Sequence, residues 1–170
     1  MQSPDFDTLC RQAAALGAVL RQRGWRLVTA ESCTGGLVSA AVTSVAGSSD
    51  WFDRGMVTYS NTAKTDLLDV DATLFAQVGA VSPEVANAMA LGALQHAQAN
   101  LAVAVTGIAG PGGGTPDKPV GTVWFGLAWR DGDGAHSQAR HRLFEGDRAA
   151  VRLQSAAFAL RWAQDAAQAA

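Results

Sequence analysis

Cysteine and long hydrophobic runs are both scarce in this sequence. Its 170 residues include only Cys10 and Cys33, with no CxxC motif, which disfavours a disulfide scaffold and a cysteine zinc site. No apolar stretch approaches the roughly 18 residues of a membrane-spanning helix. The opening MQSPDFDTLC has neither the basic start nor the apolar core of a signal peptide. We therefore expect a cytoplasmic protein that binds no membrane.

Charge of either sign is also in short supply. Thirteen Lys and Arg oppose fifteen Asp and Glu, which gives a net charge of −2, and this balance disfavours nucleic acid as a partner. Hydrophobic residues make up 48% of the chain, too many for an acidic disordered protein. A chain of this length buries roughly 70% of its extended surface without help from a metal. We expect one domain over residues 1–170, with no metal and no cofactor.

Apolar residues recur at helical and strand spacing in turn along the chain. Helices are predicted from Ser3-Pro4-Asp5 to Gly24, over 37–46, from Asn61 through Leu68, from Asp71 to Gly79, from Ser82 through Leu94, and from Gly146-Asp147 through Trp162. Strands are predicted over 27–30, 56–59, 101–106, 120–129 and 135–144, with a hairpin turn at 131–134 and the last strand at an edge. The pattern predicts a three-layer α/β/α fold with a mostly parallel, mixed sheet and a C-terminal antiparallel hairpin.

Three polar segments, at 31–36, 59–64 and 106–114, each follow a predicted strand. If those strands are parallel, the segments meet at the carboxyl edge of the sheet, where open α/β sheets bind ligands. The sequence therefore predicts a site at this edge.

The first segment places Ser32 on a glycine-rich turn between a strand and a helix. Free backbone N–H groups at such a turn can hold an anion or an oxyanion. On this segment alone, a turn whose Ser and Thr side chains merely cap the helix is an equal alternative. Cys33 is a second candidate nucleophile, although a thiol needs a basic or cationic neighbour, and Lys64 is the only clear one.

The second segment contains Lys64, one of two lysines in an arginine-rich chain, the other being Lys118. Lysine can lose its proton near neutral pH when its pKa is lowered, whereas arginine cannot. A solvated surface lysine is the alternative. Tyr59, the only tyrosine, either relays a proton or simply ends a strand.

The third segment, TGIAGPGGG, has neither the Walker Gly-Lys-Ser/Thr ending nor GxGxxG spacing, which disfavours an ATPase or a dinucleotide site. It either shapes a pocket with its backbone N–H groups or is a flexible connector. The three histidines, His96, His136 and His141, indicate neither a catalytic triad nor a metal pair.

Six blocks of this sequence closely resemble the CinA C-terminal domain family. They are AESCTGG (30–36), GSSDWFDRGMVTYSN (47–61), GAVS (79–82), TGIAGP (106–111), KPVGTVWFG (118–126) and GDRAAVR (146–152). Together they span nearly the whole chain in family order, and AESCTGG with TGIAGP is highly specific. The nearest likeness is to stand-alone members that deamidate nicotinamide mononucleotide.

The resemblance implies hydrolysis of the carboxamide of nicotinamide mononucleotide to nicotinate mononucleotide and ammonia. It implies Ser32 as nucleophile and Lys64 as base, with Tyr59 and Thr106 as polar catalytic residues of the pocket. The predicted substrate-binding residues are Cys33, Thr34, Gly35, Gly36, Asn61, Gly107, Gly110 and Arg148. Backbone N–H groups between Cys33 and Gly36 are expected to stabilise the oxyanion.

A rival interpretation is a non-catalytic nucleotide-binding or interaction module, because CinA relatives are associated with competence and DNA damage. An amidase acting on other pyridine carboxamides is a third. The presence of both Ser32 and Lys64 favours the enzyme. We also expect a homo-oligomer, a dimer.

Overall fold

One five-stranded mixed sheet forms the centre of the computed structural model, which describes residues 4–132 and 134–170. The strands are β1 (Leu27–Glu31), β2 (Phe52–Val57), β3 (Leu101–Gly107), β4 (Thr122–Asp131) and β5 (Gly134–Leu143). The helices are α1 (Phe6–Arg23), α2 (Leu37–Thr43), α3 (Asn61–Leu68), α4 (Thr73–Gln77), α5 (Pro83–Gln95) and α6 (Arg148–Ala169), with a short 3₁₀ helix η1 (Ser48–Asp50).

The strand order in the sheet is β2-β1-β3-β4-β5. Strand β1 pairs in parallel with β2 and β3, and β3–β4 and β4–β5 are antiparallel. The parallel part places the ends of β1, β2 and β3 at one edge, as the sequence indicated. The predicted three-layer α/β/α class with a C-terminal hairpin is confirmed.

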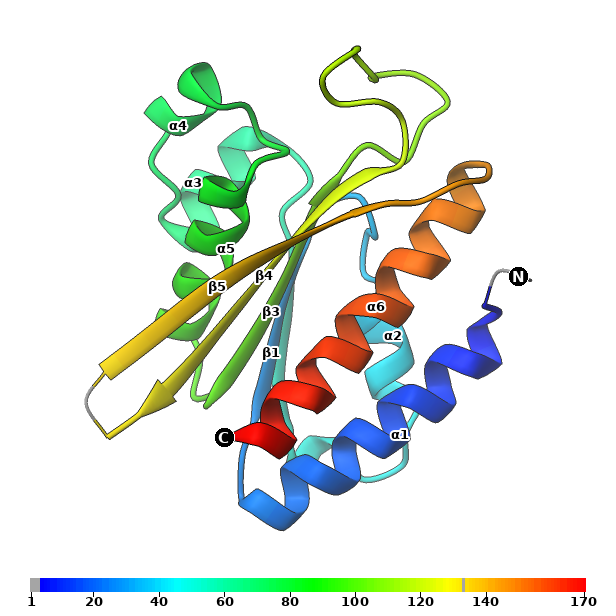
Figure 1. Cartoon of the computed structure of the whole chain (residues 1–170). Helices are drawn as coiled ribbons and strands as arrows, with labels where there is room; N and C mark the ends of the chain where they lie inside the picture. The colour runs from blue at the N-terminus through cyan, green and yellow to red at the C-terminus, as the bar shows by residue number, and fades with distance from the viewer. Residues whose placement is uncertain (1–3, 133) are drawn as a thin grey trace.

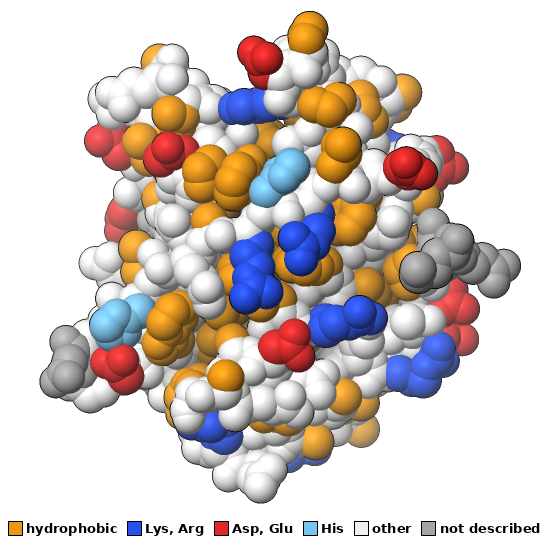
Figure 2. Space-filling model, viewed as in Figure 1, with side chains coloured by type: hydrophobic (Ala, Val, Ile, Leu, Met, Phe, Trp, Pro, Cys, Tyr) orange, Lys and Arg blue, Asp and Glu red, His pale blue; other side chains and the backbone are white. Residues whose placement is uncertain are grey.

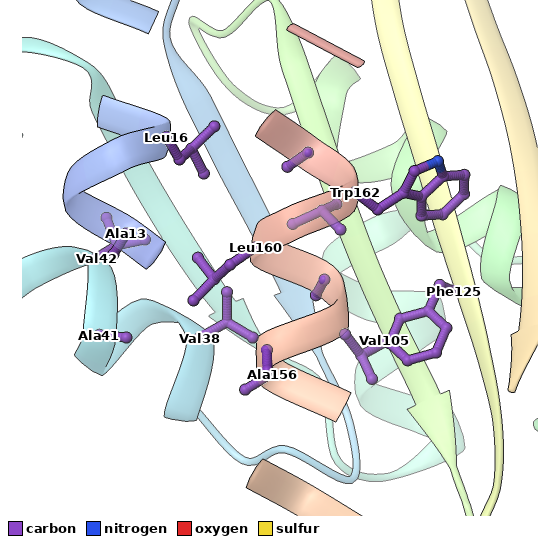
Figure 3. Close-up of a cluster of buried hydrophobic side chains, with 14 of the residues drawn as sticks. Ala13, Leu16, Val38, Ala41, Val42, Val105, Phe125, Ala156, Leu160 and Trp162 are labelled. Carbon is purple, nitrogen blue, oxygen red and sulfur yellow. The ribbon is translucent and has the colours of Figure 1, made fainter. Parts of the chain in front are cut away.

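Helices cover both faces of the sheet (Figure 1). Helices α1, α2 and α6 pack on one face, where the larger hydrophobic core lies, and α3, α4 and α5 lie on the other. In Figure 3, Leu160 and Ala156 of α6 face Val38 of α2, and Val105 of β3 lies beside Phe125 of β4. Helix α6 is thus held against both the sheet and α2, and its first turns reach the carboxyl edge.

Strand β5 is an edge strand whose exposed face carries positive charge. The Arg140 guanidinium lies 4.9 Å from the ring centre of Trp162, and that of Arg142 lies 4.5 Å from the ring centre of Phe158. Figure 2 shows basic side chains among hydrophobic ones near the centre of the side of the molecule that is turned to the viewer. Charged side chains of this kind protect an edge from pairing with another chain.

Several predicted boundaries differ from the structure. Helix α4 covers Thr73–Gln77 of the predicted 71–79, and strand β4 runs over Thr122–Asp131 and not 120–129. Strand β2 runs over Phe52–Val57 and not 56–59, because it is an edge strand whose half-exposed pattern carries no clean apolar alternation. Helix α2 ends at Thr43 rather than 46, where the Ser44 hydroxyl donates to the Ala41 carbonyl.

The helix starts predicted at Ser82 and Gly146-Asp147 are confirmed, with Ser82 and Asp147 as the N-cap residues. The predicted helix start at Ser3-Pro4-Asp5 is displaced, because α1 begins at Phe6 and Asp5 is its N-cap, with its carboxylate accepting from Thr8 N–H at 2.8 Å. Ser3 and the turn residue Asp133 lie outside the described residues.

Candidate active site

The three polar segments meet around one cavity of about 210 Å³ at the carboxyl edge of the parallel strands. Its wall is formed by Ser32, Cys33, Tyr59, Asn61, Lys64, Ala80, Val81, Thr106, Gly107, Ala109 and Arg148. These residues come from the ends of β1 and β3, from α3, from the segment before α5, and from the start of α6. Residues distant in sequence therefore share one pocket.

Ser32 and Lys64 form a buried pair in this cavity. Lys64 Nζ lies 3.0 Å from Ser32 Oγ, and the lysine is 1% exposed. Ser32 is fixed from β3, because its N–H donates to the Val105 carbonyl at 2.9 Å. Lys64 is carried by α3, whose first turn is capped when the Ser60 hydroxyl accepts from Ala63 N–H. Two elements with their own anchors thus bring the two side chains together.

The surroundings of Lys64 favour its neutral form. Burial away from water lowers the pKa of the Lys64 ammonium from its ordinary value. Its nitrogen also contacts the Thr58 carbonyl at 3.0 Å and the Tyr59 carbonyl at 3.3 Å, in addition to Ser32 Oγ. Carbonyl oxygens can only accept, so they take the two N–H groups of a neutral amine. The nitrogen lone pair is then left for the Ser32 hydroxyl proton.

Glu31, the residue before the nucleophile, holds the turn in shape. Its carboxylate accepts from the N–H groups of Gly36, Val38 and Ser39 at 2.8 to 3.1 Å, and from the Ser39 hydroxyl at 2.7 Å. The side chain is fully buried. The start of α2 therefore already holds a carboxylate, which occupies the N–H groups that a substrate anion would need.

Cys33 lies on the cavity wall but is poorly suited to be a nucleophile. It is 6% exposed, and burial raises the pKa of its thiol to about 12. A thiol held in its protonated form at neutral pH is unreactive. The structure thus favours Ser32, next to Lys64, over its neighbour.

Arg148 and Tyr59 interact at the mouth of the cavity. Arg148 Nη2 donates to the Tyr59 hydroxyl at 2.9 Å, and its Nη1 donates to the Gly110 carbonyl at 2.9 Å. The Tyr59 side chain is largely exposed, and its backbone carbonyl is the part that contacts Lys64. On the opposite wall, the buried Thr106 hydroxyl donates to the Ala80 carbonyl at 2.9 Å.

Not all predicted site residues reach the cavity wall. Ser32, Cys33, Tyr59, Asn61, Lys64, Thr106, Gly107 and Arg148 do, whereas Thr34, Gly35, Gly36 and Gly110 are not among the residues that form it. Gly36 is turned toward Glu31, and Gly110 contributes a carbonyl to Arg148. Sequence reasoning missed Ala80, Val81 and Ala109 as wall residues, although GAVS and TGIAGP contain them.

The described residues contain no cluster of His, Cys, Asp and Glu side chains that could hold a metal. His96 is paired with Asp69 at 2.6 Å, and His136 with Asp131 at 2.9 Å. No helix of the described chain combines the length and hydropathy that a membrane crossing requires.

Comparison with known proteins places this geometry in a family. A model of the CinA C-terminal domain matches residues 10–167. Nicotinamide-nucleotide amidohydrolase PncC of Enterobacter agglomerans is 55% identical over 87% of this chain and 88% of its own. A CinA-like protein of Geotalea uraniireducens is 52% identical over 86% of this chain but 34% of its own length. The crystal structure of competence/damage inducible protein CihA from Agrobacterium tumefaciens is 41% identical, covers 99% of both chains and has a TM-score of 0.89.

Proposed function

The chain belongs to the CinA C-terminal domain family, and on that basis we propose that it is a nicotinamide-nucleotide amidohydrolase. It hydrolyses the carboxamide of nicotinamide mononucleotide to nicotinate mononucleotide and ammonia. The observation that carries this proposal is the 3.0 Å contact between buried Lys64 Nζ and Ser32 Oγ in a polar cavity. The likeness to PncC over most of both chains supports the substrate class.

Acylation begins when Ser32 Oγ attacks the carboxamide carbon and its proton passes to the lone pair of Lys64 Nζ. The carbonyl π electrons move to oxygen and form a tetrahedral oxyanion. When this collapses, the C–N bond breaks and Lys64 returns the proton to the leaving nitrogen, which departs as ammonia. Ser32 is left esterified to the nicotinate carbonyl.

Deacylation repeats these steps with water as the nucleophile. Neutral Lys64 removes a proton from water as the water oxygen attacks the ester carbon. The second tetrahedral intermediate expels Ser32 Oγ, which takes the proton back from Lys64. The carboxylic acid product loses its remaining proton to solvent water and leaves as the carboxylate, and the serine and the neutral lysine are restored for the next cycle.

Arg148 is the group that binds the substrate phosphate in this proposal. The described residues of the cavity wall include two basic side chains, Lys64 and Arg148, and the mechanism uses Lys64 as a base. A guanidinium can bind a phosphate through two parallel N–H donors. Arg148 lies at the mouth, where it donates to Tyr59 and Gly110.

The phosphate role predicts a substrate-dependent defect. Charge-assisted hydrogen bonds contribute about 1.5–3 kcal/mol, so Arg148→Lys should lower kcat/KM for the mononucleotide by about 10-fold or more. The same variant should change kcat/KM for the riboside, which has no phosphate, by less than about 3-fold. Arg161→Lys, on the exposed side of α6, is the matched control. Equal losses on both substrates would assign the phosphate to another group.

The function is tested by ammonia release from nicotinamide mononucleotide, the riboside, nicotinamide and NAD, measured side by side. The mononucleotide should be the best substrate, with Ser32→Ala inactive and the exposed Ser49→Ala fully active. A non-catalytic module would release no ammonia from any of the four. A pyridine carboxamide amidase of broader range would use free nicotinamide as well as the mononucleotide.

We also propose the cytoplasm as the compartment of this protein and a homodimer as its assembly. Light scattering of the purified protein would test the homodimer.

A further inference from the structure

Thr106 stands beside Ser32 on the neighbouring strand. In the parallel pairing of β1 with β3, Glu31 lies opposite Val105, and Ser32 N–H donates to the Val105 carbonyl at 2.9 Å. The same register therefore continues to Ser32 and Thr106, on strands that lie about 4.8 Å apart. Both residues line the cavity, so the Thr106 hydroxyl is within reach of a group that Ser32 attacks.

The Thr106 hydroxyl has already donated its only proton. Its Oγ1 lies 2.9 Å from the Ala80 carbonyl oxygen, and a carbonyl oxygen can only accept, which fixes the direction of this hydrogen bond. A threonine hydroxyl has one proton and two lone pairs. Toward the cavity, this 1% exposed residue therefore presents an acceptor and no donor.

The segment that carries the Ala80 carbonyl is anchored to α5. The Ser82 hydroxyl donates to the Gly79 carbonyl at 2.8 Å and accepts from Val85 N–H at 3.3 Å as the N-cap of that helix. The Ala80 carbonyl is thus held in place on the Thr106 hydroxyl. A ligand that enters the cavity meets Thr106 with its proton already committed.

An acceptor with no proton to give distinguishes a carboxamide from a carboxylate. A primary carboxamide has two N–H donors, whereas a carboxylate has two oxygens that only accept. We propose that Thr106 Oγ1 accepts a hydrogen bond from the –NH₂ group of the substrate carboxamide, and that Thr106 is the residue by which the site prefers the amide substrate to its acid product. This inference rests on the proposed function for the identity of that substrate.

The contact also orients the amide and weakens the binding of the product. With the amide nitrogen on Thr106, the carbonyl oxygen is directed away from the hydroxyl lone pairs and the carbon is left to Ser32. After hydrolysis, a carboxylate oxygen stands where the nitrogen was, and no hydrogen lies between it and Thr106 Oγ1. A site built to hydrogen-bond an N–H group rejects an analogue that lacks it.

The first test compares substrate and product in Thr106→Val, which removes the hydroxyl and nearly keeps the shape of the side chain. Its kcat/KM for nicotinamide mononucleotide should fall by about 10-fold or more. Its inhibition constant for nicotinate mononucleotide should stay within about 3-fold of the wild type or become lower, because the product never used this hydrogen bond. Thr106→Ser keeps the hydroxyl and should restore both quantities to within about 3-fold of the wild type.

Thr122→Val is the matched control. Thr122 is 4% exposed, its hydroxyl donates to the Pro119 carbonyl at 2.6 Å, and it is not among the described wall residues of the cavity. Both quantities should stay within about 3-fold of the wild type in this variant. Equal losses for substrate and product in Thr106→Val would mean that the hydroxyl only holds the Ala80 wall, and would overturn the inference. An unchanged kcat/KM for the substrate would also overturn it.

A binding measurement separates this inference from the proposed function. Calorimetry with nicotinamide, which the proposed function makes a poor substrate, and with nicotinate needs neither turnover nor a phosphate. The wild type should bind nicotinamide at least about 10-fold more tightly than nicotinate, and Thr106→Val should lose this preference. If the wild type released no ammonia but showed both results, the proposed function would fail and the inference would stand.

The wild-type preference also decides the matter if Thr106→Val does not fold. Equal or tighter binding of nicotinate by the wild type would overturn the inference, even if the mononucleotide were hydrolysed.

Discussion

Cavities lie at both ends of the sheet. One at the amino edge, of about 560 Å³, has Arg23, Arg130 and Asp131 on its wall, and a neighbouring apolar cavity at that edge offers the clearest contrast with the carboxyl-edge cavity. The cavity at the carboxyl edge has a volume of about 210 Å³ and contains the Ser32–Lys64 pair. The apolar cavity at the amino edge measures about 280 Å³ and is lined by Trp25, Leu101, Leu127, Trp129, Gln138, Ala166, Ala169 and Ala170. No charged side chain occurs among these described wall residues. The smaller cavity is therefore the one equipped for catalysis.

The comparison teaches that buried polar groups with unusual partners mark the reactive end. At the carboxyl edge a lysine is 1% exposed, and its Nζ lies 3.0 Å from the Ser32 hydroxyl oxygen. Such groups weaken the fold unless a substrate uses them. At the amino edge, Trp129 and Trp25 serve to cover the core beside α6. Each of the following variants tests whether this division of roles holds.

The largest effect should come from Ser32→Ala, which removes the nucleophile. Loss of a catalytic serine costs on the order of 10⁶-fold in kcat where the serine, base and oxyanion site act as a unit, so turnover should fall below detection in an ammonia assay. The melting temperature should stay within a few degrees, because only one hydroxyl is removed. If the variant keeps more than a few per cent of the wild-type rate, the nucleophile is another group, and Cys33→Ala becomes the next variant to make.

Lys64→Arg should have the second largest effect, since arginine stays charged near neutral pH and cannot act as the base that neutral Lys64 provides. General-base assistance is worth about 10²–10⁴-fold, so kcat should fall by at least about 10²-fold. The chain offers a matched control in its other lysine, Lys118, whose Nζ donates to the Val78 carbonyl at 2.7 Å outside the cavity wall. Lys118→Arg should keep wild-type kcat. A near-normal kcat in Lys64→Arg would leave Lys64 as a fixed cation and Ser32 without a base.

The pH dependence of kcat/KM tests the same lysine without substitution. Burial lowers the pKa of Lys64 in the folded protein, and only the neutral amine can accept the Ser32 proton. Below that pKa, kcat/KM should therefore rise about tenfold per pH unit, and above it the profile should level off. The midpoint should lie well below the ordinary lysine value of about 10.4. A flat profile, or a midpoint near 10.4, would contradict a neutral base.

The sheet and its helical layers could be predicted from strand ends, caps and periodicity, which are local signals read in order along the chain. Local signals left Ser32 and Lys64 as candidates only, and the resemblance to a family implied their roles as nucleophile and base. Arg148 and Arg152 are both visible at the start of the last helix and, being four residues apart, share one face. Which of them reaches the cavity and which donates to the carbonyls of the nucleophile turn depends on how α6 packs against the sheet. No local pattern contains that information.

Trp129→Ala should have the smallest effect on catalysis and a clear effect on stability. The Trp129 ring lies 5.7 Å from that of His136 and packs against the core at the amino edge, far along β4 from the catalytic end. Losing a partly buried indole should lower the free energy of unfolding by about 2 kcal/mol. Because no catalytic group lies at this edge, kcat and KM should stay within about 2-fold of the wild type. Denaturant unfolding and the ammonia assay on one preparation measure both quantities. A marked loss of kcat in a variant that is fully folded at the assay temperature would mean that the two ends of the sheet are coupled, and the division between a reactive end and a structural end would have to be abandoned.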